Sequence, residues 1–395
     1  MPTSTTSRPR SRARTGTRST KGARATTGAR SRTRPARTAP AKKKTAKGRR
    51  RSRSGRGLRA ALLAVLVTAG VVTWPAVEKH PSALPFLASV FATSTPTWPL
   101  TGVPADAIAD RPALAVKIEN SVDARPQTGL GTADVVWEQV VEGGITRFVA
   151  VYHSALPPEI GPVRSIRPMD PAIAAPLGGL LAFSGGVPAY VTAAQDAGLQ
   201  ALSQDSRAGG FHRTTTRAAP HNVHAVPQTL VDQADAAHRG SPGAQFDHSA
   251  DGEEPTTVAE GRPTTSLDLT LSGVSHPRWA WSAADGRWLR SEGSTPAVES
   301  DGRRIGAANV VVLRVDVVAT EAQDPAGNPV PETILTGAGR ALVASGGHTV
   351  EATWSKPGTG DRVTLTGADG APVTLAPGTT WVELVPNSGG AVATG

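Results

Sequence analysis

The stretch that decides the fold runs from Asp134 to His153 and reads DVVWEQVVE (134–142), GG (143–144) and ITRFVAVYH (145–153). Two runs rich in β-branched and aromatic residues flank a pair of glycines. The glycines supply the positive φ angles that a tight hairpin turn needs. The pattern therefore predicts a β-hairpin in which Gly143 and Gly144 form a two-residue loop.

A two-residue loop fixes the register of the hairpin, so that Glu138 faces Val149 and Asp134 faces His153. Because side chains alternate along a strand, one face should be core and the other should mix apolar and charged groups. The mixed face is expected to carry Asp134, Val136, Glu138, Val140, Glu142, Arg147, Val149, Val151 and His153. Two interpretations stay open for this face: solvated cross-strand ion pairs, or a charged cleft covered by the following loops.

Polar residues in the neighbouring loops extend this face into a candidate ligand-binding site. Its expected members are Glu119, Asn120, Arg125, Glu138, Glu142, Arg147, Arg164, Arg167, His221 and Asn222. The guanidinium group of arginine can donate two parallel hydrogen bonds to a carboxylate or a phosphate group. Wall peptides carry carboxylates, and anionic wall polymers carry such acidic groups as well. We assign no catalytic residue, no cofactor and no metal, because the chain has no cysteine, no HExxH, no Gly-x-Ser-x-Gly and no phosphate-loop motif.

The basic character of the chain is confined to its amino-terminal tail. The net charge is +10, but residues 1–59 hold 21 Lys and Arg and no acid, which leaves 21 basic against 32 acidic residues elsewhere. The tail is poor in apolar residues, so we expect residues 1–59 to be disordered and cytoplasmic. Nucleic-acid binding would be confined to this tail, because the body is acidic.

Residues 60–77 predict a transmembrane signal-anchor helix. They are 18 uncharged residues that follow Arg59 directly, and as a helix they would span about 27 Å, enough to cross a bilayer. The positive-inside rule places the tail in the cytoplasm and the body outside. We favour an uncleaved anchor over a cleaved signal peptide because no clean small-x-small site follows closely. An extracytoplasmic spacer is expected at 78–98.

The body changes character once along its length. Residues 99–240 alternate strand and helix patterns, which predicts an α+β (mixed α/β) domain, and residues 241–263 read as a linker. Residues 264–386 predict an all-β carboxy-terminal domain, followed by a flexible tail at 387–395. Its strands are expected at 266–271, 278–282, 287–291, 309–319, 340–344, 349–355, 362–366 and 380–385. Its tryptophans are either core residues or a platform for glycan stacking: Trp279, Trp281, Trp288, Trp354 and Trp381.

Five motifs carry a resemblance to a known family: RPALAVKIEN (111–120), ARPQTGL (124–130), EGGITRF (142–148), GPVRSIRP (161–168) and APHN (219–222). They closely resemble the YerB-like envelope lipoprotein family (domain of unknown function 3048), and segments at 309–312, 352–354 and 377–384 look like its second domain. The resemblance covers about 99–386 and implies a two-domain extracytoplasmic envelope protein, without implying an activity. The lipid-bearing cysteine is missing before Pro99, so the helix at 60–77 is the expected anchor.

These observations favour a membrane-anchored binding or scaffold protein of the cell envelope. Its expected partner is a cell-wall polymer or an envelope protein, and the sequence predicts no oligomeric state. One alternative is a wall hydrolase or transferase with Glu138 or Glu142 as acid/base. The other alternative is DNA association through the basic tail.

Overall fold

The central hairpin lies in the middle of a 12-stranded sheet with the strand order β18-β17-β16-β14-β19-β2-β3-β1-β4-β5, to which β15 and β8 add further pairings. The structure is a computed structural model that describes residues 95–324 and 327–395. The expected tail, the membrane helix at 60–77 and most of the spacer lie outside the described residues. Within the described residues, the helices are all too short or too polar to cross a membrane.

The amino-terminal half mixes strands and short helices, as its sequence pattern predicts. Its strands are β1 (Leu114–Glu119), β2 (Val135–Val140), β3 (Thr146–Tyr152), β4 (Leu180–Phe183), β5 (Gln200–Ser203), β6 (Phe211–Arg213) and β7 (Val223–Ala225). Its helices are η2 (Val122–Ala124), η3 (Leu130–Thr132), η4 (Glu142–Gly144), α3 (Asp170–Ala174), η5 (Ala175–Leu177), α4 (Pro188–Asp196) and α5 (Pro227–Val231). Both α3 and α4 begin with a proline in their first turn, where its missing N–H is not needed.

The carboxy-terminal half is mostly β, and a strand forms in all eight predicted ranges. Its strands are β8 (Arg262–Pro263), β9 (Ser266–Thr270), β10 (Pro277–Ser282), β11 (Arg287–Glu292), β12 (Thr295–Pro296), β13 (Gly306–Ala307), β14 (Asn309–Gln323), β15 (Pro329–Ile334), β16 (Gly337–Ser345), β17 (His348–Lys356), β18 (Thr364–Thr366), β19 (Thr380–Pro386) and β20 (Ala391–Thr394). Two expectations are corrected. The linker contains the helix α6 (Thr256–Glu260), and the expected flexible tail contains β20, which is ordered by pairing with β9.

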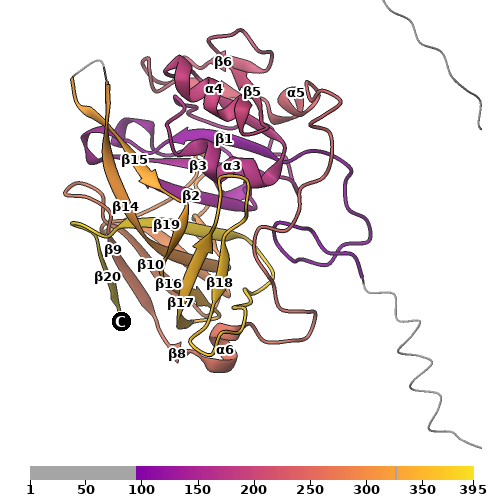
Figure 1. The fold of residues 1–395 in the computed structure, drawn as a ribbon, viewed down its shortest axis with the longest axis vertical. Helices are drawn as coiled ribbons and strands as arrows, with labels where there is room; N and C mark the ends of the chain where they lie inside the picture. The colour runs from indigo at the N-terminus through magenta and orange to yellow at the C-terminus, as the bar shows by residue number, and fades with distance from the viewer. Residues whose placement is uncertain (1–94, 325–326) are drawn as a thin grey trace, which may run out of the picture. The chain divides into compact units, whose positions relative to one another are not determined.

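The two halves share the main sheet. Strand β19, from the end of the chain, pairs in parallel with β14 on one side and with β2 on the other. Figure 1 shows the yellow β19 lying between the orange β14 and the purple β2. The pairing places residues that are far apart in the sequence side by side, above all Glu138 and Glu383.

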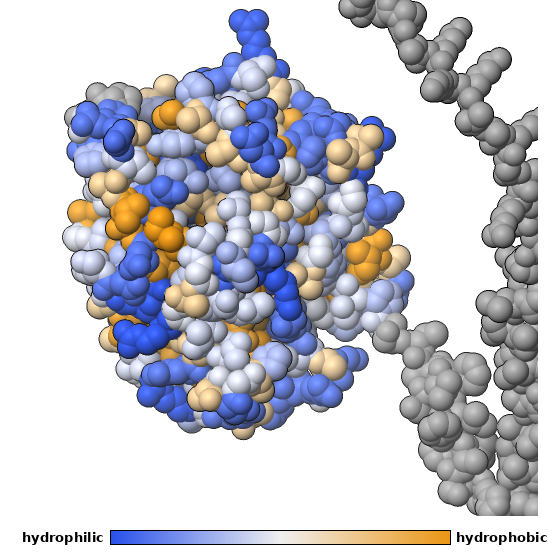
Figure 2. Space-filling view, viewed as in Figure 1, coloured by the Kyte–Doolittle hydropathy of each residue, from blue (hydrophilic) through white to orange (hydrophobic). Residues whose placement is uncertain are grey.

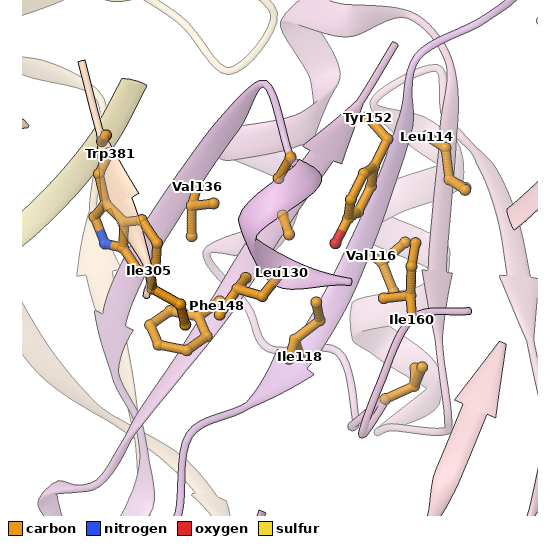
Figure 3. Packing of buried hydrophobic residues seen from close by; sticks show 14 of the residues in the cluster. Leu114, Val116, Ile118, Leu130, Val136, Phe148, Tyr152, Ile160, Ile305 and Trp381 are labelled. Atoms are coloured by element: carbon orange, nitrogen blue, oxygen red, sulfur yellow. The ribbon is translucent and has the colours of Figure 1, made fainter. Parts of the chain in front are cut away.

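A second sheet covers one face of the main sheet. It has six strands, ordered β12-β11-β10-β9-β20 with β13 paired to β11. The core between the sheets includes Phe148, Trp279, Trp288 and Trp381, and Figure 3 shows Phe148 and Trp381 in it. The opposite face of the main sheet is covered by α3, α4 and loops, and buries Trp354. Four of the five carboxy-terminal tryptophans are therefore at most 2% exposed, which confirms that they are core residues. On the outside, Figure 2 shows mostly hydrophilic residues with separated apolar patches.

The hairpin forms as predicted, but its register is shifted by one residue. Glu138 faces Phe148 and Val140 faces Thr146. Val141 donates a hydrogen bond to the carbonyl of Ile145 at 2.8 Å, so the loop holds three residues rather than two. The extra residue is Glu142, which joins the glycines in the short turn η4. Both glycines have the expected positive φ, 69° and 74°.

The shift reverses the faces of β3, because the side-chain period of a strand is two residues. Glu138 shares a face with Phe148 and Tyr152, in the core between the sheets. Arg147 lies on the other face, beside Gln139. The expected common face of Glu138 and Arg147 is therefore wrong, because their side chains lie on opposite sides of the sheet.

Candidate ligand-binding site

A cavity of about 370 Å³ lies where the amino-terminal half meets the second sheet. We call it the interdomain pocket. Its lining residues are Val122, Arg125, Pro126, Gln127, Leu130, Phe148, Arg290, Glu292, Thr295, Pro296, Ala297, Val298 and Ile305. They come from the loop after β1, from β3, and from β11 and the segment that follows it.

The walls of the pocket are mainly apolar. Figure 3 shows Leu130 and Ile305 close to the ring of Phe148, and all three line the cavity. The loop after β1 is tied to the loop after β12, because the N–H of Ser300 donates to the carbonyl of Gln127 at 2.8 Å. The two halves of the chain thus close the pocket together.

The polar side chains of Arg125, Gln127 and Glu292 define one end of the pocket. Arg125 donates to the side-chain oxygen of Asn120 at 3.0 Å and to its carbonyl at 2.8 Å. Its guanidinium also lies 3.3 Å from a carboxylate oxygen of Glu292. Gln127 donates to the same Asn120 oxygen at 3.0 Å. Arg125 remains 31% exposed, so its guanidinium can still meet a ligand.

Behind this end lies a buried network centred on Arg290. Its guanidinium contacts Glu138 at 2.7 Å, Glu383 at 2.9 Å and Glu292 at 3.0 Å. Glu138 and Glu383 are neighbours in adjacent parallel strands, a like-charge arrangement that destabilises a sheet unless a cation compensates it. Arg290 supplies that cation. Its guanidinium carbon also lies 5.0–5.6 Å from the centres of three aromatic rings, those of Phe148, Trp279 and Trp381.

Burial and mutual repulsion shift the protonation of these carboxyl groups. Burial raises the pKa of Glu138, an effect that Arg290 partly offsets. Burial and the neighbouring Glu138 raise the pKa of Glu383 well above its usual value. Burial also opposes ionisation of Glu292, but the guanidiniums of Arg290 and Arg125 lower its pKa overall. Burial and mutual repulsion thus both favour a proton shared between Glu138 and Glu383.

On the opposite face of the main sheet lies a second group, the arginine cluster: Arg147, Arg164, Arg167, Glu119, Glu142 and His221. A carboxylate oxygen of Glu142 lies 2.5 Å from Nε of Arg167, and the other lies 3.7 Å from the guanidinium of Arg147. Glu119 lies 3.4 Å from Arg164 and 3.0 Å from His221. Burial and the adjacent guanidiniums of Arg167 and Arg164 lower the pKa of Arg147.

The arginine cluster rests on a buried pair that sequence reasoning missed. Lys117 lies 2.6 Å from Asp170, and both side chains are 0% exposed. Asp170 also accepts hydrogen bonds from Gln139 at 2.6 Å and from the backbone N–H of Arg167 at 2.7 Å. Burial lowers the pKa of Lys117 to about 8, against the opposing influence of Asp170. The pair anchors the loop that carries Arg164 and Arg167 to the centre of the sheet.

The ten candidate residues thus fall into three places. Six form the arginine cluster, and Asn120, Arg125 and Glu138 belong to the interdomain pocket and its network. Asn222 belongs to neither, because it accepts from Arg213 at 2.8 Å and donates to the carbonyl of Thr214 at 3.0 Å, which holds the β6–β7 hairpin. Across the described residues, no group of three or more His, Asp or Glu is placed to hold a metal ion.

The sequence of the chain matches the models of two domains of one family. Residues 100–240 match the family described as "Protein of unknown function (DUF3048) N-terminal domain", and residues 267–382 match the corresponding C-terminal domain. The chain is a member of this family.

The relatives that resemble this chain include one protein known from both its sequence and its structure. The protein named "Putative lipoprotein YerB" from Bacillus subtilis (strain 168) is 47% identical over 70 residues, which are 18% of this chain and 21% of that protein. The chain thus matches about a fifth of the length of this curated relative. The crystal structure of YerB protein from Bacillus subtilis has a TM-score of 0.64 to this fold at 21% identity. That match covers 76% of this chain and 100% of the other, and it shows a shared fold.

Proposed function

We propose that this protein is a membrane-anchored, extracytoplasmic binding protein of the cell envelope that holds a short peptide of the cell wall in the interdomain pocket. The observation that carries the proposal is the pocket itself. Apolar walls that end in a few convergent polar groups are typical of sites for small ligands. Here Arg125, Gln127 and Glu292 form the polar end.

The location rests on the sequence before the described residues. A basic segment precedes 18 uncharged residues, which favours an anchor with the body outside. The Bacillus relative is named a lipoprotein, and this chain contains no cysteine that could carry a lipid. The helix at 60–77 would replace that anchor.

The chemistry of the pocket favours a peptide over a purely anionic ligand. The guanidiniums of Arg125 and Arg290 are paired with three glutamates, Glu138, Glu292 and Glu383, so the pocket has no excess positive charge to attract a polyanion. A short peptide with small side chains offers methyl groups to the apolar walls, amides to Gln127 and a terminal carboxylate to the fork of Arg125. Wall stem peptides combine these groups.

Binding is favoured over catalysis by the position of the acids. Glu138 is 0% exposed and is engaged by Arg290, Thr146 and Asn120. A general acid or base must come within hydrogen-bond distance of the group that it serves. Glu142 lies on the other face, in an ion pair with Arg167. These positions support a binding protein rather than a hydrolase or transferase.

The test is calorimetric titration of the full-length chain in detergent with soluble wall fragments that carry stem peptides. Arg125→Ala should weaken binding by about ten- to hundredfold, since hydrogen bonds to a charged group contribute about 1.5–3 kcal/mol. Ala297→Phe should abolish binding by filling the cavity. Arg278→Ala is the matched control, because Arg278 is 52% exposed and pairs with Asp268 on the second sheet. Unchanged affinity in both pocket variants would refute the proposal.

The arginine cluster provides a second contact with the wall if Arg164 and His221, which are 22% and 24% exposed, meet anionic groups there. The measurement is retention of the protein on purified cell wall. Arg147→Ala combined with Arg164→Ala should reduce retention to what the interdomain pocket alone supports. Equal retention of the variant and the unmodified chain would exclude this contact.

A further inference from the structure

A groove with three arginines lies at the edge of the region where the second sheet covers the main sheet. Its volume is about 290 Å³, and its lining includes Arg262, Arg314, Arg340, Glu351, Val312 and Leu342. It shares no lining residue with the interdomain pocket. The argument that follows is independent of the proposed function.

The groove begins where the faces of β14 and β16 that point towards the second sheet change from apolar residues to arginines. Along β14, Val310 and Val312 are buried beneath the second sheet, and the next residue on that face is Arg314. Along β16, Leu342 packs against the same core, and the next residue on its face is Arg340. The apolar alternation of both strands thus ends in an arginine at the same level of the sheet.

The strand register brings these two arginines close together. Strands β14 and β16 are antiparallel and pair as far as Leu313 and Ala341, and Arg314 and Arg340 are the residues that come directly after this last pair. Like charges that face each other across neighbouring strands destabilise a sheet. Burial, and then the charge of Arg340, lower the pKa of Arg314. This pair of arginines does not stabilise the sheet unless an anion binds beside it.

Within the described residues, no acidic side chain forms an ion pair with either arginine. Among them, Arg262, Arg314 and Arg340 take part in none of the ion pairs. Arg314 donates only to backbone carbonyls, those of Asn387 at 3.1 Å and Gly390 at 3.3 Å. Its Nε is buried without a hydrogen-bond partner. Glu351 is exposed and leaves the groove with an excess of two positive charges.

We infer that the groove formed by Arg262, Arg314 and Arg340 binds a phosphate group. Guanidiniums bind oxyanions through paired N–H donors, and three of them, from β8, β14 and β16, line this one groove. Three guanidiniums match an anion with more than two oxygens, and a phosphate carries four, whereas a carboxylate carries two. The phosphate is either a free ion or a unit of a phosphodiester polymer, in which two of the four oxygens stay charged and two are esterified.

The experiment is calorimetric titration of the full-length chain in detergent with inorganic phosphate, with soluble poly(glycerol phosphate) and with acetate. Arg340 is exposed, so Arg340→Ala leaves the fold intact and should weaken phosphate binding by about ten- to hundredfold. Arg262→Ala should weaken it in the same direction. Arg278→Ala, an exposed arginine that already has its own acidic partner, should leave binding unchanged.

A second measurement separates binding from folding. Without phosphate, Arg340→Gln should raise the melting temperature, because it removes the repulsion of Arg314. With phosphate present, the unmodified chain should gain more thermal stability than the variant. Tighter binding of the polymer than of the free ion would assign a polymer site, and the reverse would assign a free-ion site. The inference is overturned if acetate binds as tightly as phosphate, or if the Arg340 and Arg262 variants bind phosphate like the unmodified chain.

Discussion

Replacing Arg290 by methionine should destabilise the fold strongly and in a pH-dependent way. Methionine keeps much of the volume of the side chain, so the change removes charge rather than packing. In the unmodified protein, this guanidinium contacts Glu138, Glu383 and Glu292. Without it, the acids at the junction of the two sheets lose their shared partner.

The expected magnitude follows from counting the charges that stay unpaired. Glu138 and Glu383 are adjacent and both have a raised pKa, so we count one negative charge for the pair. In the variant, Glu292 still has an ion-pair partner, because the guanidinium of Arg125 lies 3.3 Å from its carboxylate. One buried charge is therefore left without a partner, and losing one member of a buried pair costs about 3–5 kcal/mol.

The pH dependence has a definite sign. Burial already raises the pKa of Glu138, and loss of Arg290 raises it further. A carboxyl group with a raised folded-state pKa binds more protons in the folded state than in the unfolded state. Its contribution to stability is therefore present at low pH and is lost as the pH rises through the folded-state pKa. The variant should regain stability as the pH falls from neutral towards the pKa of an ordinary glutamate.

The assay is urea unfolding of the full-length chain in detergent at pH 7.5 and pH 5.5, followed by tryptophan fluorescence, because Trp279 and Trp381 flank Arg290. Arg278→Met is the matched control, and its exposed ion pair should contribute at most about 1 kcal/mol. A loss below about 1 kcal/mol for Arg290→Met would refute the assigned role of the network. An equal loss at both pH values would refute the proton sharing.

Three further outcomes are expected. Lys117→Met should lower the free energy of unfolding by about 3–5 kcal/mol, because it leaves Asp170 buried without its cation; urea unfolding measures this. Gly143→Ala should lower the free energy of unfolding by roughly 1–2 kcal/mol, because alanine is strained at this positive φ. Gly144→Ala should lower it more, because the added methyl group would also lie 3.1 Å from the Ser272 hydroxyl oxygen. Comparing the melting temperatures of the two variants tests this order. Burial lowers the pKa of His248 from 6.5 to about 4, so stability should fall as the pH falls between these values, and His248→Asn should flatten that slope in thermal melts.

Much of the fold could be predicted from local patterns. The eight carboxy-terminal strands alternate apolar and polar residues between glycine-containing turns, and this signal needs no distant partner. The hairpin was predicted for the same reason. Its register was not, because Glu142 suits either the end of a strand or the first residue of a three-residue turn. One residue in that turn decides which face Arg147 occupies.

The candidate site was only partly predictable for a different reason. The arginines of the loop at 160–170 are visible as a motif, and they do gather with Glu119, Glu142 and His221. Arg290 and Glu383 occupy strand positions that sequence alone assigns to an ordinary charged surface. Their burial depends on the pairing of β19 with β2, which joins segments from opposite ends of the body. No local pattern carries that information.

The shared sheet also determines how the protein can be dissected. Four residue pairs join β2 to β19, from Val135 with Thr380 to Glu138 with Glu383. Cutting the chain between its two family regions would separate β2 from β19 and leave each fragment with an unpaired, apolar edge strand. Such borders recruit other chains, so either fragment produced alone should aggregate, whereas the two produced together should recover a soluble complex.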